Sequence, residues 1–170
     1  AALDSAHEDG CGVNQWQWTA SLGNNGATSQ SEGFEFSFEL PAGWSLDATS
    51  NRRWEVGATS NASGFGPGVW HSGNAGAGIY LDDEYRNNML THLYTPEYTL
   101  PVNSTSRLTF RSWVCTEASW DGGAVSISTD GGQNWWFLPP TLNGFHDQIS
   151  TVNSNSPLFG EGIFDGSNVA

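Results

Sequence analysis

The sequence predicts an all-β protein, an antiparallel β-sandwich of the jelly-roll kind. Aromatic residues are numerous, with 9 Phe, 9 Trp and 4 Tyr, whereas charged residues make up only 14% of the chain. The residues that favour long helices are scarce, and lysine is absent. Short alternating stretches are instead separated by Gly-rich turns, and the chain holds 21 glycines. Many short strands with such turns are typical of sandwiches and jelly rolls.

The expected strands share either an alternation of apolar and polar residues or a short apolar run between turn residues. They cover 15–19, 33–40, 53–56, 78–81, 93–98, 107–115, 124–129 and 135–138. We find no internal repeat and no domain boundary, so we expect a single domain over 1–170. Within it, 1–31 is interpreted as an N-terminal extension with one strand, 33–140 as the core, and 150–170 as a polar tail.

The charge of the chain excludes two classes of partner. Its formal net charge is −13, and its five basic residues are all arginines. Binding to nucleic acid needs a basic surface that displaces counterions, and docking on anionic lipid needs the same. The sequence also lacks the roughly 18 consecutive apolar residues of a membrane span. We therefore expect neither nucleic-acid binding nor membrane insertion.

Two features indicate a secreted or cell-surface protein. The chain starts with Ala-Ala-Leu-Asp, which is typical of the start left by a signal peptidase. Its two cysteines, Cys11 and Cys115, are too far apart in the sequence for a CxxC redox or zinc pair. We expect them to form a disulfide, since secreted proteins favour this bond. The alternative is two unrelated buried thiols.

Residues 128–135, Ser-Thr-Asp-Gly-Gly-Gln-Asn-Trp, resemble an Asp-box, a hairpin signature of sialidases and other secreted β proteins. In this signature the Asp caps a turn, glycines adopt positive φ, and the Trp packs beneath the turn. Sialidases carry several copies together with an arginine triad, whereas this chain has one copy and no such triad. We therefore interpret the segment as a structural hairpin.

A longer resemblance rests on the order and spacing of several short segments within 33–140. These are 38–44 (Phe-Glu-Leu-Pro-Ala-Gly-Trp), 54–57 (Trp-Glu-Val-Gly), 71–74 (His-Ser-Gly-Asn), Tyr85, 94–96 (Tyr-Thr-Pro), 108–110 (Leu-Thr-Phe), Trp113 and 121–132. Their arrangement resembles the jelly-roll modules of secreted bacterial proteases and adhesins. It is similar to the MAM-like modules of immune-inhibitor-A-type metalloproteases and, more loosely, to the cleaved-adhesin domains of gingipains.

This resemblance implies a non-catalytic extracellular β-sandwich that serves adhesion or accessory binding, often with a structural calcium ion. The chain departs from the family at its C-terminal end. Such modules continue past the Phe-Asp-Gly at 164–166 into closing strands, whereas this sequence stops at Ala170. We expect the chain to be a fragment, or another chain to supply the missing pairing by strand addition.

Calcium also has support from the residues themselves, because this ion prefers several carboxylate and carbonyl oxygens on loops. The acidic run at 82–84 is compact, Glu117 and Asp121 flank one predicted turn, and Glu39 directly precedes Leu-Pro. The candidate ligands are Glu39, Asp82, Asp83, Glu117 and Asp121. The alternative is a solvated acidic surface, which is the ordinary place for carboxylates in a chain this negative.

The surplus of aromatic residues predicts a ligand-binding surface for a glycan or a protein. Flat tryptophan rings stack on sugar rings and on apolar side chains. The candidates are the tryptophans least tied to the alternating core pattern, namely Trp16, Trp18, Trp70, Trp120 and Trp136. The alternative is that these rings fill the interior of a domain with few leucines.

Three function classes remain. The first is the accessory binding module. The second is a structural subunit of a filament, fibre or surface layer, assembled from copies of itself by strand addition. The third is a hydrolase, although the four histidines are far apart and neither a GxSxG nor an HExxH motif is present. We expect no catalytic residues, because carboxylates such as Glu35 and Glu39 fit the polar positions of an alternating strand.

Overall fold

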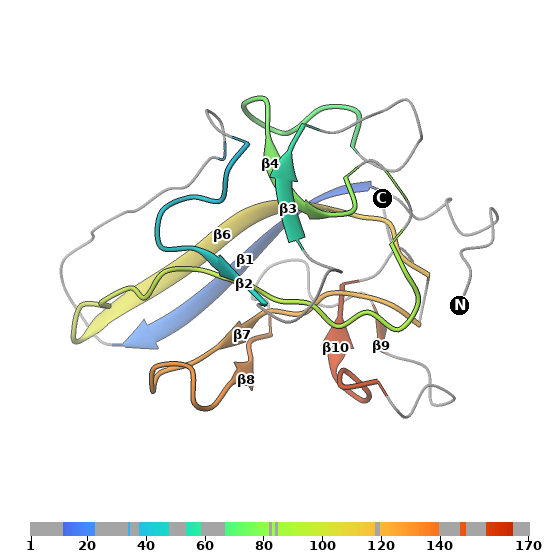
Figure 1. Ribbon diagram of the computed structural model, residues 1–170. Helices are drawn as coiled ribbons and strands as arrows, with labels where there is room; N and C mark the ends of the chain where they lie inside the picture. Colours follow the sequence, from blue (N-terminus) through green and yellow to red (C-terminus); the bar gives the residue numbers. More distant parts are fainter. Residues whose placement is uncertain are drawn as a thin grey trace. The chain divides into compact units, whose positions relative to one another are not determined.

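The fold was analysed in a computed structural model of residues 1–170 (Figure 1). The structure describes residues 12–22, 34, 38–47, 54–58, 67–81, 83, 85–117, 120–139, 147–148 and 156–164. Over these residues the secondary structure consists of strands with no helix, and each strand pairs antiparallel with one partner. The prediction of an antiparallel all-β chain is thus confirmed in this general form. None of the described segments forms a helix that is long and apolar enough to cross a membrane.

The chain divides into two compact units. Unit I consists of Ala1–Ala2 and Ala27–Thr99, and unit II consists of Leu3–Gly26 and Leu100–Ala170. The N-terminal strand therefore belongs to the unit formed by the C-terminal half of the chain. Each unit is described by itself below.

Unit I contains two short antiparallel ladders. Strand β2 (Ser45–Leu46) pairs with β5 (Leu93–Tyr94), and β3 (Trp54–Gly57) pairs with β4 (Gly76–Ile79). Its most buried apolar side chains, among those described, are Ala75 and Leu81.

The indole of Trp70 closes one side of the β3–β4 ladder. Its Nε1 donates a hydrogen bond to the carbonyl of Gly57, at 3.1 Å. Its ring lies so close to Gly76 that a Cβ on this residue would come within 2.6 Å of the ring. Glycine at position 76 is therefore required for the ring to pack on the strand.

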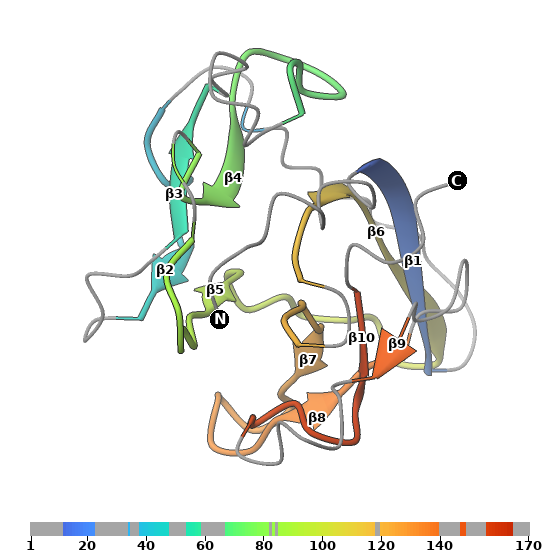
Figure 2. The same cartoon turned by 90° about the vertical axis from the view of Figure 1, so that its right-hand side faces the viewer.

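Unit II is built around a long ribbon. Strands β1 (Gly12–Leu22) and β6 (Ser104–Val114) pair over 11 residues and run side by side in Figures 1 and 2. Two shorter ladders join β7 (Ser126–Ile127) to β8 (Trp136–Phe137), and β9 (Asp147–Gln148) to β10 (Gly162–Ile163).

The core of unit II forms where β10 ends. Ile163 is fully buried and Phe164 is nearly so. Phe164 exchanges two backbone hydrogen bonds of 2.9 Å with Gly123, which fixes the end of β10 beside the residues before β7. Around the Phe164 ring pack the partly buried side chains of β6, of Val125 and of the residue after β8. They are Phe110, Val114, Val125 and Leu138.

Several strand predictions differ from the structure in their bounds. The strand predicted at 33–40 is not formed at 38–40, which bend, and Phe34 has a φ of 50° that an extended strand does not allow. Residues 35–37 lie outside the described part. The strand predicted at 78–81 is β4, which ends at Ile79 because Tyr80 has a φ of 53°. The strand predicted at 93–98 ends at Tyr94, and Pro96 offers no N–H for a longer ladder.

The sequence analysis did not predict β2, β9 or β10. Residues 162–164, which the sequence analysis placed within the tail 150–170, contain β10 and the centre of the unit II core. Three apolar or small residues in a polar context give no clear signal of burial. Their burial depends on pairing with Gly123, which lies far away in the sequence.

Candidate functional site

The turn between β7 and β8 is organised by two side chains, those of Ser128 and Asp130. The Ser128 Oγ accepts the backbone N–H of Gly132 at 2.8 Å and donates to Asp130 Oδ1 at 2.8 Å. The same Oδ1 accepts the backbone N–H groups of Gln133 and Asn134, at 3.0 and 2.9 Å. The carboxylate therefore closes the turn, as the Asp-box pattern predicts.

These hydrogen bonds strongly favour the charged form of Asp130. The backbone N–H of Asn134 contributes most, followed by its side-chain amide, which donates to Oδ2 at 2.6 Å, and by the Ser128 hydroxyl. Together they lower the pKa of Asp130 to about 2. Gly131 and Gly132 supply the positive φ values, 72° and 84°, that the tight turn needs.

Three consecutive exposed aromatic residues follow this turn, and we call them the aromatic triplet: Trp135, Trp136 and Phe137. Their exposed fractions are 48%, 52% and 39%. Successive side chains along a strand point to opposite faces, and Leu138 packs against the core. Strand β8 contains Trp136 and Phe137, so these two side chains point to opposite faces. If the alternation is extended by one residue at each end, Trp136 lies on the side of Leu138, where it is still 52% exposed, and Trp135 lies with Phe137 on the other side, the outer face.

The predicted ligand-binding tryptophans lie in different places. Trp136 belongs to the triplet, and Trp120 lies in the 117–121 turn of unit II and is also exposed. Trp70 is half-buried on the β3–β4 ladder of unit I, where its contacts give it a structural role. Trp16 and Trp18 stand in β1 opposite Phe110 and Leu108, and their side chains lie outside the described part. The sequence analysis did not single out Trp135 and Phe137 as binding residues.

Two of the predicted calcium ligands share one turn of unit II. The carbonyl of Glu117 accepts the backbone N–H groups of Trp120 and Asp121, at 3.1 and 3.0 Å. The Thr116 hydroxyl donates to the Asp121 carbonyl at 3.0 Å. Glu117 and Asp121 are thus held in the same tight turn.

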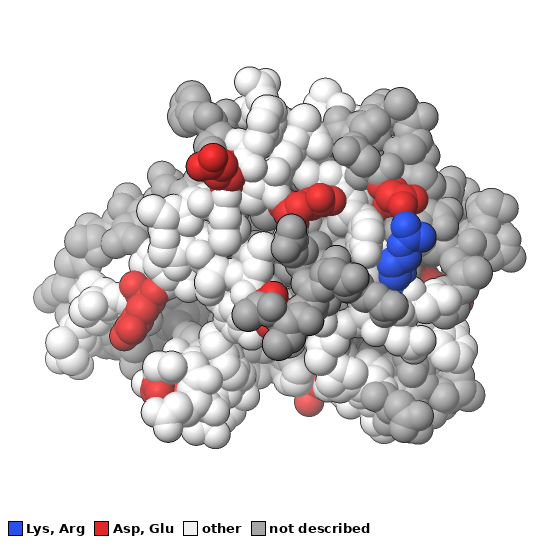
Figure 3. Space-filling model, viewed as in Figure 1, with Lys and Arg blue, Asp and Glu red and all other residues white. Residues whose placement is uncertain are grey.

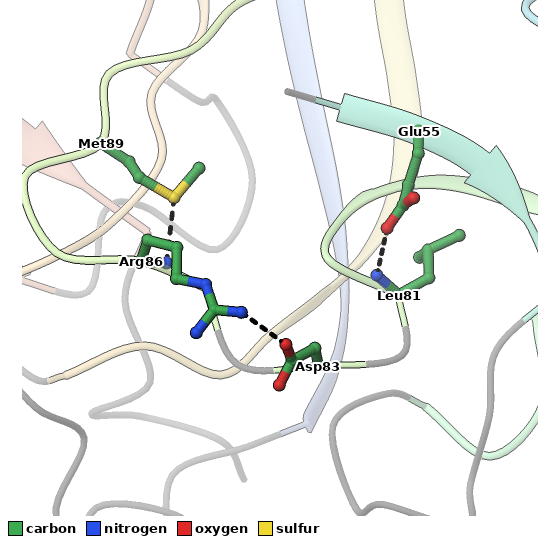
Figure 4. A network of polar contacts seen from close by, with 5 residues as sticks. All are labelled: Glu55, Leu81, Asp83, Arg86 and Met89. Carbon is green, nitrogen blue, oxygen red and sulfur yellow. Dashed lines mark hydrogen bonds and ion pairs between the residues drawn. The ribbon is translucent and has the colours of Figure 1, made fainter. Parts of the chain in front are cut away.

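The other predicted calcium ligands belong to unit I. Asp83 forms an ion pair of 2.7 Å with Arg86 (Figure 4). The guanidinium of Arg86 also lies 5.5 Å from the centre of the Tyr80 ring. The charge of this carboxylate is therefore balanced by a neighbouring cation. Glu39 lies exposed in a bend, and Asp82 lies outside the described residues.

A further carboxylate, Glu55, approaches the same acidic segment from β3. Its Oε1 accepts the backbone N–H of Leu81 at 2.6 Å, as Figure 4 shows. The backbone N–H of Arg86 donates to the sulfur of Met89 at 3.1 Å, which closes the following turn. Across the described ranges, no three His, Cys, Asp or Glu side chains are placed to hold a metal ion. Calcium binding stays a prediction.

The structure also reveals a polar cluster that sequence reasoning missed, formed by Asp47, His92 and Tyr94 in unit I. Asp47 Oδ2 accepts the backbone N–H of His92 at 2.7 Å and contacts its Nδ1 at 2.9 Å. Asp47 Oδ1 accepts the Tyr94 hydroxyl at 3.2 Å, and the His92 and Tyr94 rings stack. The carboxylate thereby extends the two-residue β2–β5 ladder by side-chain hydrogen bonds.

The cluster shifts the pKa values of two of its members. Burial tends to raise the pKa of Asp47, but the hydrogen bonds from the His92 side chain and backbone outweigh it, so this pKa is lowered from 3.8. Burial and the negative charge of Asp47 raise the pKa of Tyr94 above 10.0. Through these hydrogen bonds the cluster holds the end of β2 against β5, which is a structural role.

Cys115 follows β6 directly and is disulfide-bonded. The other cysteine of the chain, Cys11, precedes β1 and lies outside the described residues. Strands β1 and β6 pair with Gly12 opposite Val114. The predicted bond would therefore close this end of the ribbon.

Comparison with known proteins yields one relative and no family. No family model matches the chain, and no solved structure matches it. A stretch of 104 residues is 33% identical to bacillopeptidase F of Bacillus subtilis (strain 168). This stretch makes up 61% of the present chain but 7% of bacillopeptidase F. The chain is therefore similar to a small part of a bacterial protein whose name marks it as a peptidase. The MAM-like or cleaved-adhesin-like assignment stays a prediction.

Proposed function

We propose that this chain is a non-catalytic extracellular module that binds a ligand or adheres to a surface, and that its fold is a β-sandwich of the jelly-roll kind. The observation that carries the proposal is the proportion of the match to bacillopeptidase F. The similar region makes up 61% of this chain and only 7% of the peptidase. So small a share of a large enzyme is typical of an accessory part rather than of a whole catalytic domain.

Two members of the aromatic triplet, Trp135 and Phe137, support a binding role for this module. Neighbouring exposed rings on one face are typical of contact sites, whereas single exposed apolar side chains are ordinary. Trp135 and Phe137 lie on the same face of the hairpin and are exposed by 48% and 39%. The Asp130 network holds the turn beside them in one conformation, which lowers the entropy cost of binding.

The proposal includes a structural calcium ion, with Glu117 and Asp121 as the ligands most favoured by their shared turn. Calcium bound only by the folded chain stabilises it through mass action. We expect chelation to lower the melting temperature of the purified chain, and added calcium to restore it. A melting curve that thorough chelation leaves unchanged would remove calcium from the proposal.

The experiment that tests the proposed function assays binding and turnover in the same sample. The purified chain is presented to panels of immobilised glycans and extracellular proteins, and the bound material is examined for hydrolysis products. We expect saturable binding with no product. Turnover of a peptide or glycan would make the chain a hydrolase. Ordered assembly of the chain with itself, without binding to any panel member, would favour a structural subunit.

A further inference from the structure

We propose that the outer face of the β7–β8 hairpin, formed by Trp135 and Phe137, is a binding site for an uncharged polysaccharide. This inference rests on the proposed function and names its ligand class and its site. Trp135 and Phe137 stand two residues apart on the face turned away from Leu138, which packs in the core. In extended backbone, the Cα atoms of residues two apart are separated by about 7 Å. The two rings therefore form a short row on which successive sugar rings of a polymer can stack.

The first ring of this row is held in place before any ligand binds. The Trp135 Nε1 donates a hydrogen bond to the Gly132 carbonyl at 3.1 Å, so the indole is tied to the turn that precedes it. That turn is itself fixed by the hydrogen bonds to Asp130. A fixed ring loses little side-chain entropy when a ligand stacks on it.

Polar groups that can orient a sugar lie next to the rings. The side chains of Gln133 and Asn134 are exposed. The Gln133 amide donates one N–H to the backbone carbonyl of Asp130 at 3.1 Å, and the Asn134 amide donates one N–H to Asp130 Oδ2 at 2.6 Å. An amide has a second N–H and a carbonyl oxygen besides. These groups match the hydroxyls of a sugar, which both donate and accept. A purely apolar partner would gain nothing from them.

The charges of the chain favour an uncharged ligand. Residues 131–139 contain neither acidic nor basic side chains, and the net charge of the chain is −13. In Figure 3 the region where Figure 1 draws the β7–β8 hairpin is predominantly white. An anionic polymer would be repelled by the whole chain. For a cationic polymer, this hairpin turn offers a single carboxylate, that of Asp130. Its oxygens already accept hydrogen bonds from the turn, so it is a poor partner for a cation.

The test is affinity electrophoresis of the full chain in native gels that contain one polysaccharide each. Starch, laminarin, mannan and xylan serve as uncharged probes, and alginate serves as the anionic probe. The variants are Trp135→Ala and Phe137→Ala on the outer face, with Trp136→Ala as a matched control on the opposite face. Because Trp135→Ala also removes the bond to Gly132, Phe137→Ala tests the face without that loss. Circular dichroism confirms that each variant is folded.

We expect at least one uncharged polymer to retard the wild-type chain and alginate not to do so. Each outer-face variant should weaken that binding about tenfold, equivalent to ~1.4 kcal/mol, and Trp136→Ala should retain it. If both outer-face variants are still retarded like the wild-type chain, the assigned face is overturned. The same follows if Trp136→Ala loses retardation as much as the outer-face variants do. Absence of retardation by every uncharged polymer would overturn the ligand class. The proposed function would survive that result if the chain bound a protein surface in the panel assay.

Discussion

The two units of this chain are stabilised by different means. Unit II has a buried apolar centre, Ile163 and Phe164, and an 11-residue ribbon. Unit I has ladders of two and four residue pairs, a smaller buried apolar set (Ala75 and Leu81), and carboxylates, those of Asp47 and Glu55, that accept hydrogen bonds from other segments. Apolar burial does not depend on the charge of a carboxylate, whereas hydrogen bonds to a carboxylate do. The comparison therefore predicts that acid and core mutations affect the two units differently.

The largest expected effect concerns the centre of unit II. Phe164→Ala removes a nearly buried ring and leaves a cavity beside Phe110 and Leu138, which costs about 3–5 kcal/mol. Phe159→Ala, the same substitution five residues earlier at a side chain that is 43% exposed, should cost about 1 kcal/mol or less. Urea denaturation measures both changes. Equal destabilisation by the two variants would contradict the placement of the core at the end of β10.

A second pair of variants tests the packing between β10 and the residues before β7. A Cβ at Gly122 would lie 2.7 Å from both the Ile163 Cδ1 and the Phe164 carbonyl, and a backbone atom cannot move aside easily. Gly122→Ala should therefore cost about 1–3 kcal/mol. At Gly123 a Cβ meets nothing within 4 Å, so Gly123→Ala is a matched control with a much smaller cost. Thermal unfolding measures the loss of stability in both variants. A larger loss in Gly123→Ala than in Gly122→Ala would refute the account.

The third prediction concerns the polar cluster of unit I. Asp47→Asn weakens the hydrogen bonds from His92 and Tyr94, and we expect a loss of about 1 kcal/mol. Asp83→Asn removes an exposed ion pair, which contributes little, and serves as the control in the same unit. Hydrogen exchange at the His92 amide reports the change locally. Unaltered protection in Asp47→Asn would show that the carboxylate does not hold β2 to β5.

The same cluster should respond to acid with a defined sign. Because the pKa of Asp47 is lowered in the folded chain, its contribution to stability is present above its unfolded pKa of 3.8. This contribution is lost as the pH falls below that value and the carboxylate is protonated. Protection of the His92 amide should therefore decrease on acidification before that of the Phe164 amide does. Simultaneous loss of both would argue against separate sources of stability in the two units.

The smallest effect is expected at the turn of the β7–β8 hairpin. Asp130 should titrate with a pKa of about 2, because the turn donates several hydrogen bonds to its carboxylate. Since this pKa is depressed, the turn keeps its hydrogen bonds at mildly acidic pH and loses them only as the pH falls through about 2. Asn134→Ala removes one donor and should raise the pKa of Asp130, as measured by NMR titration of its side chain. A titration unaffected by this variant would contradict the assigned geometry.

The sequence allowed the all-β class and the approximate positions of seven strands to be predicted, because their patterns are local. The Asp-box pattern at 128–135 likewise predicted the turn, since its hydrogen bonds join residues within four positions of one another. The ladder β2–β5 and the core role of Phe164 were missed. Both depend on partners distant in sequence, namely the Asp47 carboxylate with His92 and the Gly123 backbone with Phe164.

The candidate site was predicted only in part for a similar reason. The strand predicted at 135–138 places Trp135 and Trp136 on opposite faces, but alternation alone does not identify which face packs on the core. Packing of Leu138 against Phe164 identifies it and assigns Trp135 and Phe137 to the outer face. The ion pair between Asp83 and Arg86 is local, yet an acidic run by itself gave no indication that one of its charges is balanced.

Hydrogen–deuterium exchange of the full chain, with and without the polysaccharide that retards it most, tests the binding account most directly. The account predicts that added protection is confined to the β7–β8 hairpin and its turn in unit II. It also predicts that the amides of β2–β5 and β3–β4 in unit I exchange at unchanged rates. Protection centred on unit I, or protection absent from 130–139, would contradict a binding site on the outer face of the β7–β8 hairpin.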